Sequence, residues 1–117
     1  MNWRLVDSDL VSPEESGARD EAILEARIKE LVPNTLHFYI RDRPTVSLGY
    51  FQKVDKAVAL DFCRSRNIKI LRRVSGGSAI YTDDKQLIYA VVLKEDLGSV
   101  PESYKKICEA VILGLGF

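Results

Sequence analysis

The sequence is poor in the residues that build metal sites and disulfide frameworks, and neither sign of charge is in excess. Its two cysteines, Cys63 and Cys108, lie far apart, and His37 is the only histidine. The spacing of these three residues matches no metal-binding motif, and two distant cysteines do not make a disulfide framework. We therefore expect two buried thiols in a reducing, cytoplasmic setting. Seventeen basic residues offset seventeen acidic ones, so net charge gives no support to nucleic-acid binding.

Long apolar runs are also absent. No stretch approaches the ~20 apolar residues needed to span a bilayer, and the N-terminus leads into acidic residues rather than an apolar signal core. We therefore expect neither a membrane partner nor secretion. We find no internal repeat, low-complexity tract or linker in the 117 residues, so we expect residues 1–117 to form a single domain.

Two helix starts share one pattern, in which a serine is followed within two residues by a proline and, three residues after the serine, by a glutamate. Ser12 and Ser99 are the expected caps, each completing a capping box with its glutamate. Alanines at helical spacing after Ser12 suggest close packing against a sheet, and Pro33-Asn34 ends that helix. Apolar residues at helical spacing after Ser99 predict a core-facing helix: Tyr104, Ile107, Cys108, Val111, Ile112 and Leu115.

The segments between these helices are typical of strands, with one further helix at 55–66 that turns Phe62 and Cys63 inward. Residues 41–44 connect the second and third strands as a hairpin. The interleaving of helices with hairpin strands predicts a mixed α/β (α+β) fold, a mixed β-sheet flanked by helices. The expected strands are 3–6, 35–40, 45–48, 68–72, 79–81 and 86–93.

The loop Ser75-Gly76-Gly77-Ser78 lies between two expected strands and follows Arg72 and Arg73. Consecutive glycines let the backbone present several N–H groups to one point. Adjacent side chains of an extended segment point to opposite faces, so only one arginine can serve the ligand. A guanidinium holds a carboxylate or a phosphate through two hydrogen bonds. This combination indicates a site for a carboxylate, a phosphate or the mixed anhydride joining them.

Other interpretations of the loop exist. A Gly-Gly pair between strands is often only a turn or a bulge. A Walker-type phosphate loop is excluded because no Gly-Lys-Ser or Gly-Lys-Thr occurs. A dinucleotide fingerprint is excluded because the third glycine and the following helix are missing.

The wider context of the loop resembles the lipoate–protein ligase family, part of the biotin/lipoate ligase superfamily. The run Leu71–Asp83 is similar to the family pattern Arg-Arg-x-Ser-Gly-Gly-Gly-Ala-Val-Tyr-His-Asp. Residues 35–39 and 44–52 look like the family's strand pair and its Gly-x-x-Gln segment, and Asp20-Glu21-Ala22 fits the first helix. The resemblance covers nearly the whole chain, in order, and implies the biotin/lipoate–protein ligase fold for this N-terminal part of a catalytic domain.

The resemblance also implies an activity. Family members activate lipoate with ATP, with Mg²⁺ expected, and transfer it from lipoyl-adenylate to a lysine of a carrier domain. Such carriers belong to 2-oxoacid dehydrogenases or to the glycine cleavage protein. By the motif match, Arg73 contacts the carboxylate or phosphate end of the acyl group. The other implied substrate-binding residues are Ser75, Gly76, Gly77, Ser78, Tyr81, Thr82 and Gln86, with Tyr50 and Ile80 beside the acyl tail.

The sequence departs from the family pattern in several places. Ser78 replaces the third glycine, where a positive φ would cost roughly 1 kcal/mol, and Thr82 replaces a histidine. The family's catalytic lysine is expected beyond Phe117, so the resemblance predicts no catalytic residue here and an inactive chain without a complementary C-terminal segment or subunit.

Several alternatives stay open. Octanoyl transfer without ATP belongs to the same chemistry. A non-catalytic subunit that binds an acyl ligand or a partner is a different class, as is a mixed α/β fragment with no ligand affinity. His37 lies in a strand of alternating pattern and is interpreted as structural. Cys63 could be proposed as a nucleophile that accepts an acyl group, but the sequence positions no histidine or lysine as a base beside it.

Overall fold

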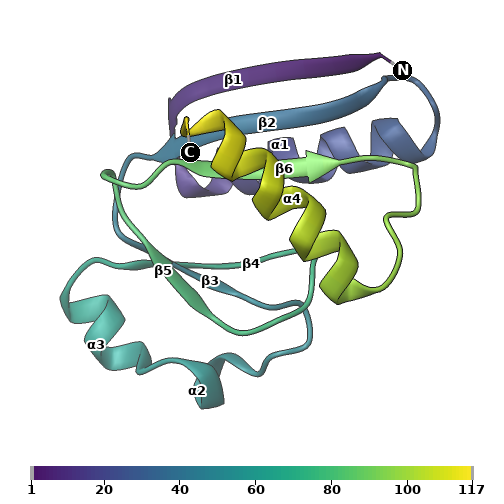
Figure 1. The fold of residues 1–117 in the computed structure, drawn as a ribbon. Coiled ribbons are helices and arrows are strands. Elements are labelled where there is room, and N and C mark those ends of the chain that lie inside the picture. The colour runs from purple at the N-terminus through teal and green to yellow at the C-terminus, as the bar shows by residue number, and fades with distance from the viewer. Residues whose placement is uncertain (1, 117) are drawn as a thin grey trace.

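The chain folds into two small mixed sheets with helices around them, in a computed structural model that describes residues 2–116 (Figure 1). One sheet has the order β1-β2-β6 and the other the order β4-β3-β5. The strands are β1 Trp3–Val11, β2 Asn34–Arg41, β3 Thr45–Leu48, β4 Lys69–Arg72, β5 Ile80–Thr82 and β6 Ile88–Val92. The helices are α1 Pro13–Ile28, α2 Val54–Ala57, α3 Leu60–Ser65 and α4 Val100–Gly114.

Each sheet contains one parallel and one antiparallel pair, which confirms the mixed α/β class. In the first sheet β2 runs parallel to β1 and antiparallel to β6. In the second, β3 runs parallel to β4 and antiparallel to β5. The expected hairpin across residues 41–44 is wrong, because both edges of β2 are already occupied by β1 and β6. The chain therefore leaves the first sheet after Arg41 and begins the second at Thr45.

Helix α1 starts at its predicted cap, but the capping box expected there is only half formed, because the Glu15 carboxylate pairs with Arg19 instead of reaching back to Ser12. The Ser12 hydroxyl accepts a hydrogen bond from the Glu15 amide at 3.2 Å, with Pro13 in the first turn. The helix ends at Ile28, before the predicted stop at Pro33, and its buried residues are Pro13, Ser16 and Ile23. The prediction that alanines pack against the sheet is wrong for Ala18 and Ala22, which are exposed.

The face of β2 that α1 covers is built mainly from hydrogen-bonding side chains. Four alternate residues of β2 are buried there: Thr35, His37, Tyr39 and Arg41. The intervening residues, including Leu36 and Phe38, lie on the opposite face, which α4 crosses (Figure 1).

Helix α4 forms as predicted but does not face a core. Ser99 and Glu102 make the full capping box. Tyr104 is 67% exposed and Leu115 69% exposed, and α4 contains no buried residue in its described length. An apolar groove of about 770 Å³ separates α4 from the β1-β2-β6 sheet. The expectation of a core-facing helix is therefore wrong for these residues.

The segment between β3 and β4 also differs from expectation. The predicted helix 55–66 is two short helices, because Val58 adopts an extended backbone after α2; a β-branched residue favours that conformation. Cys63 is buried, as expected, but Cys108 and Phe62 are exposed. Asn67, the predicted stop, takes a positive φ of 54°. Within residues 2–116, no helix has the length and apolar character to cross a bilayer.

Candidate functional site

The glycine loop is anchored to the end of β3. The Arg73 amide donates to the Leu48 carbonyl at 2.8 Å, and the Tyr50 amide donates to the Ser75 carbonyl at 2.9 Å. The side chain of Gln52 accepts a hydrogen bond from the Gly49 amide at 2.9 Å. The Gly-x-x-Gln segment therefore fixes the backbone against which the loop rests.

Two glycines make this contact possible. A Cβ added at Gly49 would overlap the carbonyl oxygen of Gly77 and lie 2.8 Å from its carbonyl carbon. Gly77 itself has a φ of 95°, in the region that disfavours side chains. Ser78 is not among the described residues with positive φ, so the backbone strain predicted for it does not arise. The positive φ of the loop is at Gly77, which has no Cβ.

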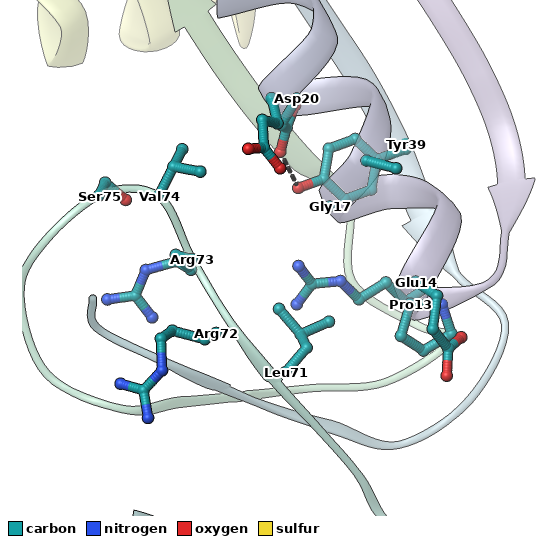
Figure 2. Close-up of a pocket in the computed structure, with 13 residues that line it drawn as sticks. Pro13, Glu14, Gly17, Asp20, Tyr39, Leu71, Arg72, Arg73, Val74 and Ser75 are labelled. Atoms are coloured by element: carbon teal, nitrogen blue, oxygen red, sulfur yellow. Dashed lines mark hydrogen bonds between the residues drawn. The ribbon is translucent and has the colours of Figure 1, made fainter. Parts of the chain in front are cut away.

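Both arginines bind main-chain carbonyls. The Arg73 guanidinium donates to the carbonyls of Ser47, Gly76 and Ser78 at 2.6–2.9 Å. Arg72 donates to the carbonyls of residues 49, 50 and 52. Figure 2 shows both side chains extending away from α1. The two arginines thus hold the loop and the 49–52 segment in place.

The carbonyls of the loop face the protein, which determines where its amides point. Ser75 O accepts from Tyr50, Gly76 O accepts from Arg73, and Gly77 O packs on Gly49. In a trans peptide the N–H points opposite to the C=O, and no cis bond occurs in the described chain. The amides of Gly76, Gly77 and Ser78 therefore point away from the partners of the preceding carbonyls, and they donate to no acceptor within residues 2–116.

A cavity of about 330 Å³ lies between α1 and the strand that leads into the loop (Figure 2). Its walls come from the first two turns of α1, from the end of β2 and from residues 71–75. The charged residues that line it are Glu14, Asp20, Glu21, Arg41, Arg72 and Arg73. Charges of both signs therefore lie on walls that also carry apolar side chains such as Leu71 and Val74, and the loop forms one end of the cavity.

A buried network fixes the α1 wall of this cavity. Asp20 accepts a hydrogen bond from the Tyr39 hydroxyl at 2.8 Å, and its other oxygen lies 2.8 Å from Nδ1 of His37. Nε2 of His37 lies 2.7 Å from the Ser8 hydroxyl. Burial raises the pKa of Tyr39 well above its ordinary value, and the Asp20 charge raises it further. His37 thus has the structural surroundings that its strand position predicted.

Replacing Tyr39 tests this network. Tyr39→Phe leaves one Asp20 oxygen without its donor, and we expect a loss of about 1.5 kcal/mol in the free energy of unfolding at neutral pH. Because the pKa of Tyr39 is raised in the folded state, the unfolded chain loses this proton first, and stability falls as pH rises above about 10. Urea titrations at pH 7 and at alkaline pH measure both effects.

The variant should lose less stability on alkaline titration than the wild type, since its Tyr39 contribution is gone. Tyr89→Phe is the matched control, because Tyr89 is 42% exposed and should leave both values unchanged. Equal loss from the two variants would contradict the role of Asp20.

The predicted site residues separate into two groups. Arg73 and Ser75 line the cavity, and Gly76, Gly77 and Ser78 form the exposed loop beside it. The others do not line the cavity: Tyr81 is half exposed, Thr82 is buried against Arg41, and Gln86 accepts from the Asp83 amide in its turn.

The residues proposed beside an acyl tail, Tyr50 and Ile80, are each about half exposed and also lie outside the cavity lining. Sequence reasoning missed Asp20, Tyr39 and Arg41 as a group. A signal was present for Tyr39 and Arg41, because β2 places a residue able to form hydrogen bonds at every second position, on one face of the strand; Asp20 lies in α1 and carried no such signal. Among the described residues, no three potential metal ligands gather.

Comparison with known proteins agrees with the fold described above. Residues 12–116 match the model of the lipoyl protein ligase A/B catalytic domain. The octanoyltransferase LipM of Moorella thermoacetica is 38% identical over 117 residues, which cover 97% of this chain and 42% of that protein. The chain thus spans less than half the length of this relative.

Two solved structures share both the fold and about a third of the aligned residues with this chain. A lipoate-protein ligase A bound with ATP superposes with a TM-score of 0.81 and 32% identity, covering 98% of this chain and 48% of that one. A bi-partite lipoate protein ligase from Thermoplasma acidophilum, described with its E2 lipoyl domain, gives a TM-score of 0.80 and 31% identity, covering 96% and 44%.

Proposed function

This chain belongs to the lipoyl protein ligase A/B catalytic domain family, and from that premise we propose that it forms the acyl-binding part of an octanoyltransferase. The reaction moves an octanoyl group from a thioester donor to a lysine of a lipoyl carrier domain, and it needs no ATP. The support is the 38% identity to the octanoyltransferase LipM of Moorella thermoacetica, in an alignment that covers 97% of this chain. The carriers in this proposal are the lipoyl domains of 2-oxoacid dehydrogenases or the glycine cleavage protein.

The observation that carries the proposal is that the amides of Gly76, Gly77 and Ser78 donate to no acceptor in the described chain and point away from the partners of the preceding carbonyls. When a lysine attacks a thioester, negative charge develops on the acyl carbonyl oxygen, and preorganised N–H donors stabilise that charge. Arg73 acts here as a positioning residue, because it draws loop carbonyls toward itself. Its guanidinium also adds positive potential behind the amides.

A second candidate is ATP-dependent activation of lipoate. The observation that favours it is the 32% identity to a lipoate-protein ligase A bound with ATP. The same amides suit an acyl phosphate, since phosphate oxygens also accept backbone N–H donors. This candidate reaction would use Mg²⁺ together with ATP.

The open apolar groove supports a further part of the proposal. The surface between α4 and the β1-β2-β6 sheet is mainly apolar, and Leu87 and Leu115 in its lining are exposed, so a further polypeptide would bury apolar side chains there. We place a C-terminal polypeptide of the same family over it, in the same chain or as a separate subunit. The bi-partite ligase of Thermoplasma acidophilum is a neighbour of this kind. The catalytic lysine of the family pattern would come from that polypeptide.

Ligand binding by this chain separates the two candidates. Calorimetry compares a non-hydrolysable octanoyl-pantetheine analogue with a non-hydrolysable lipoyl-adenylate analogue. We expect the octanoyl thioester analogue to bind at least about tenfold more tightly, with unacylated pantetheine and AMP as controls. The opposite order would favour lipoate activation, and no binding of either analogue would contradict both candidates.

A further inference from the structure

Arg41 is a buried cation whose partners are all neutral. Only 3% of the residue is exposed. Its Nε donates to the Ser16 hydroxyl at 3.1 Å, and Nη1 donates to the Thr82 hydroxyl at 3.2 Å. The guanidinium carbon lies 5.7 Å from the centre of the Tyr39 ring. No carboxylate in the described part of the chain forms an ion pair with it.

Such a charge is costly unless an anion accompanies it. Other arginines in the chain do not face this cost: Arg43, for example, is exposed and lies 2.7 Å from Asp42. Arg41 therefore stands out as a guanidinium withdrawn from water without a counter-charge. This is the pattern of a residue that receives an anion from outside the chain.

The cavity in front of Arg41 offers that anion a place. Arg41 lines the 330 Å³ space between α1 and the strand leading to the glycine loop. Two of the carboxylates on the same walls are already engaged, since Glu14 pairs with Lys69 at 2.8 Å and Asp20 accepts from Tyr39. Glu21 is the remaining one and is exposed.

We propose that Arg41 forms an anion subsite in this cavity, separate from the loop amides, which binds a carboxylate or a phosphate group. The planar guanidinium recognises either group through charge-assisted hydrogen bonds. The inference goes beyond acyl transfer and does not depend on it, because it follows from the burial and the neutral surroundings of Arg41.

Calorimetry on the chain with simple probes tests this subsite. Inorganic phosphate and octanoate are the two anions, and octanamide is the neutral control. We expect one or both anions to bind and octanamide to bind at least about tenfold more weakly than octanoate. Binding of phosphate alone would assign the site to phosphate groups, and binding of octanoate alone to carboxylates. Absence of binding by both anions would overturn the proposal.

Two variants connect the binding to Arg41. Arg41→Gln should weaken anion binding by about tenfold or more, whereas Arg43→Gln, which removes an exposed arginine, should not. Because Arg41→Gln also alters bonds to Ser16 and Thr82, a second variant keeps the test decisive. Gly17→Leu fills the cavity from α1, where a Cβ meets nothing within 4 Å, and leucine is the better helix former.

Gly17→Leu should therefore fold and lose the anion while the bonds of Arg41 remain. Full anion binding by Gly17→Leu, or by a folded Arg41→Gln, would overturn the subsite. The octanoyl-pantetheine measurement is independent of this result. Thioester binding without anion binding would refute the subsite and leave the proposed function, and the reverse result would do the opposite.

Discussion

Gly49→Ala should lower the free energy of unfolding by about 3 kcal/mol or more, because it forces two backbones apart. The new methyl group would occupy the position of the Gly77 carbonyl oxygen. Backbone atoms held by the contacts of Arg73 and Tyr50 with the loop cannot move aside as a flexible side chain can. Urea denaturation monitored by circular dichroism measures the loss.

Gly76→Ala is the matched control for this experiment. Gly76 lies in the same loop, but an added Cβ meets nothing within 4 Å and its φ is not in the positive range. We expect a change of no more than about 0.5 kcal/mol. If Gly49→Ala were as stable as Gly76→Ala, the loop would not rest on β3 as described.

Arg73→Ala should weaken binding of the octanoyl-pantetheine analogue by at least about a hundredfold. The variant removes the donor that holds the Gly76 and Ser78 carbonyls. Those carbonyls are then free to turn, and the amides of the loop lose their fixed positions. Calorimetry gives the affinity, and hydrogen exchange of the loop amides reports its order.

Arg66→Ala controls for the loss of one positive charge, because Arg66 lies over the Phe62 ring, outside the cavity lining. Arg73→Lys is informative as well, since a single ammonium group cannot reproduce the planar fork. Unchanged affinity in Arg73→Ala would show that the loop keeps its shape without the guanidinium, which contradicts a positioning role.

The sequence predicted the helix starts and most strands because those signals are local. Ser12 and Ser99 cap their helices as their spacing requires. Thr45–Leu48 forms a strand with the predicted bounds. The sheet order could not be predicted, because the pairing partners of β2 lie about 30 and 50 residues away along the chain. A local hairpin pattern at 41–44 therefore gave the wrong neighbour.

The site was predictable only in part. The glycine loop and Arg73 carry a local pattern, and the structure brings them together. The position of the loop also depends on Ser47 in β3, which accepts from Arg73, and on Gly49 just after β3, which lies against the Gly77 carbonyl. The buried charge of Arg41 depends on Ser16 and Thr82, from two other elements. Such long-range contacts leave no mark at neighbouring sequence positions.

Helix α4 shows the same limit from the opposite side. Its helical spacing predicted an apolar face correctly, but periodicity does not say what covers that face. In the structure, Tyr104 and Leu115 stay exposed and Val111 borders the groove.

Strand β2 has a consequence for how the chain behaves in solution. It covers its hydroxyl, imidazole and guanidinium groups and leaves Leu36 and Phe38 beside an open groove. The hydrophobic attraction between such surfaces weakens on cooling. Isolated copies of this chain should therefore self-associate when warmed and dissociate again on cooling.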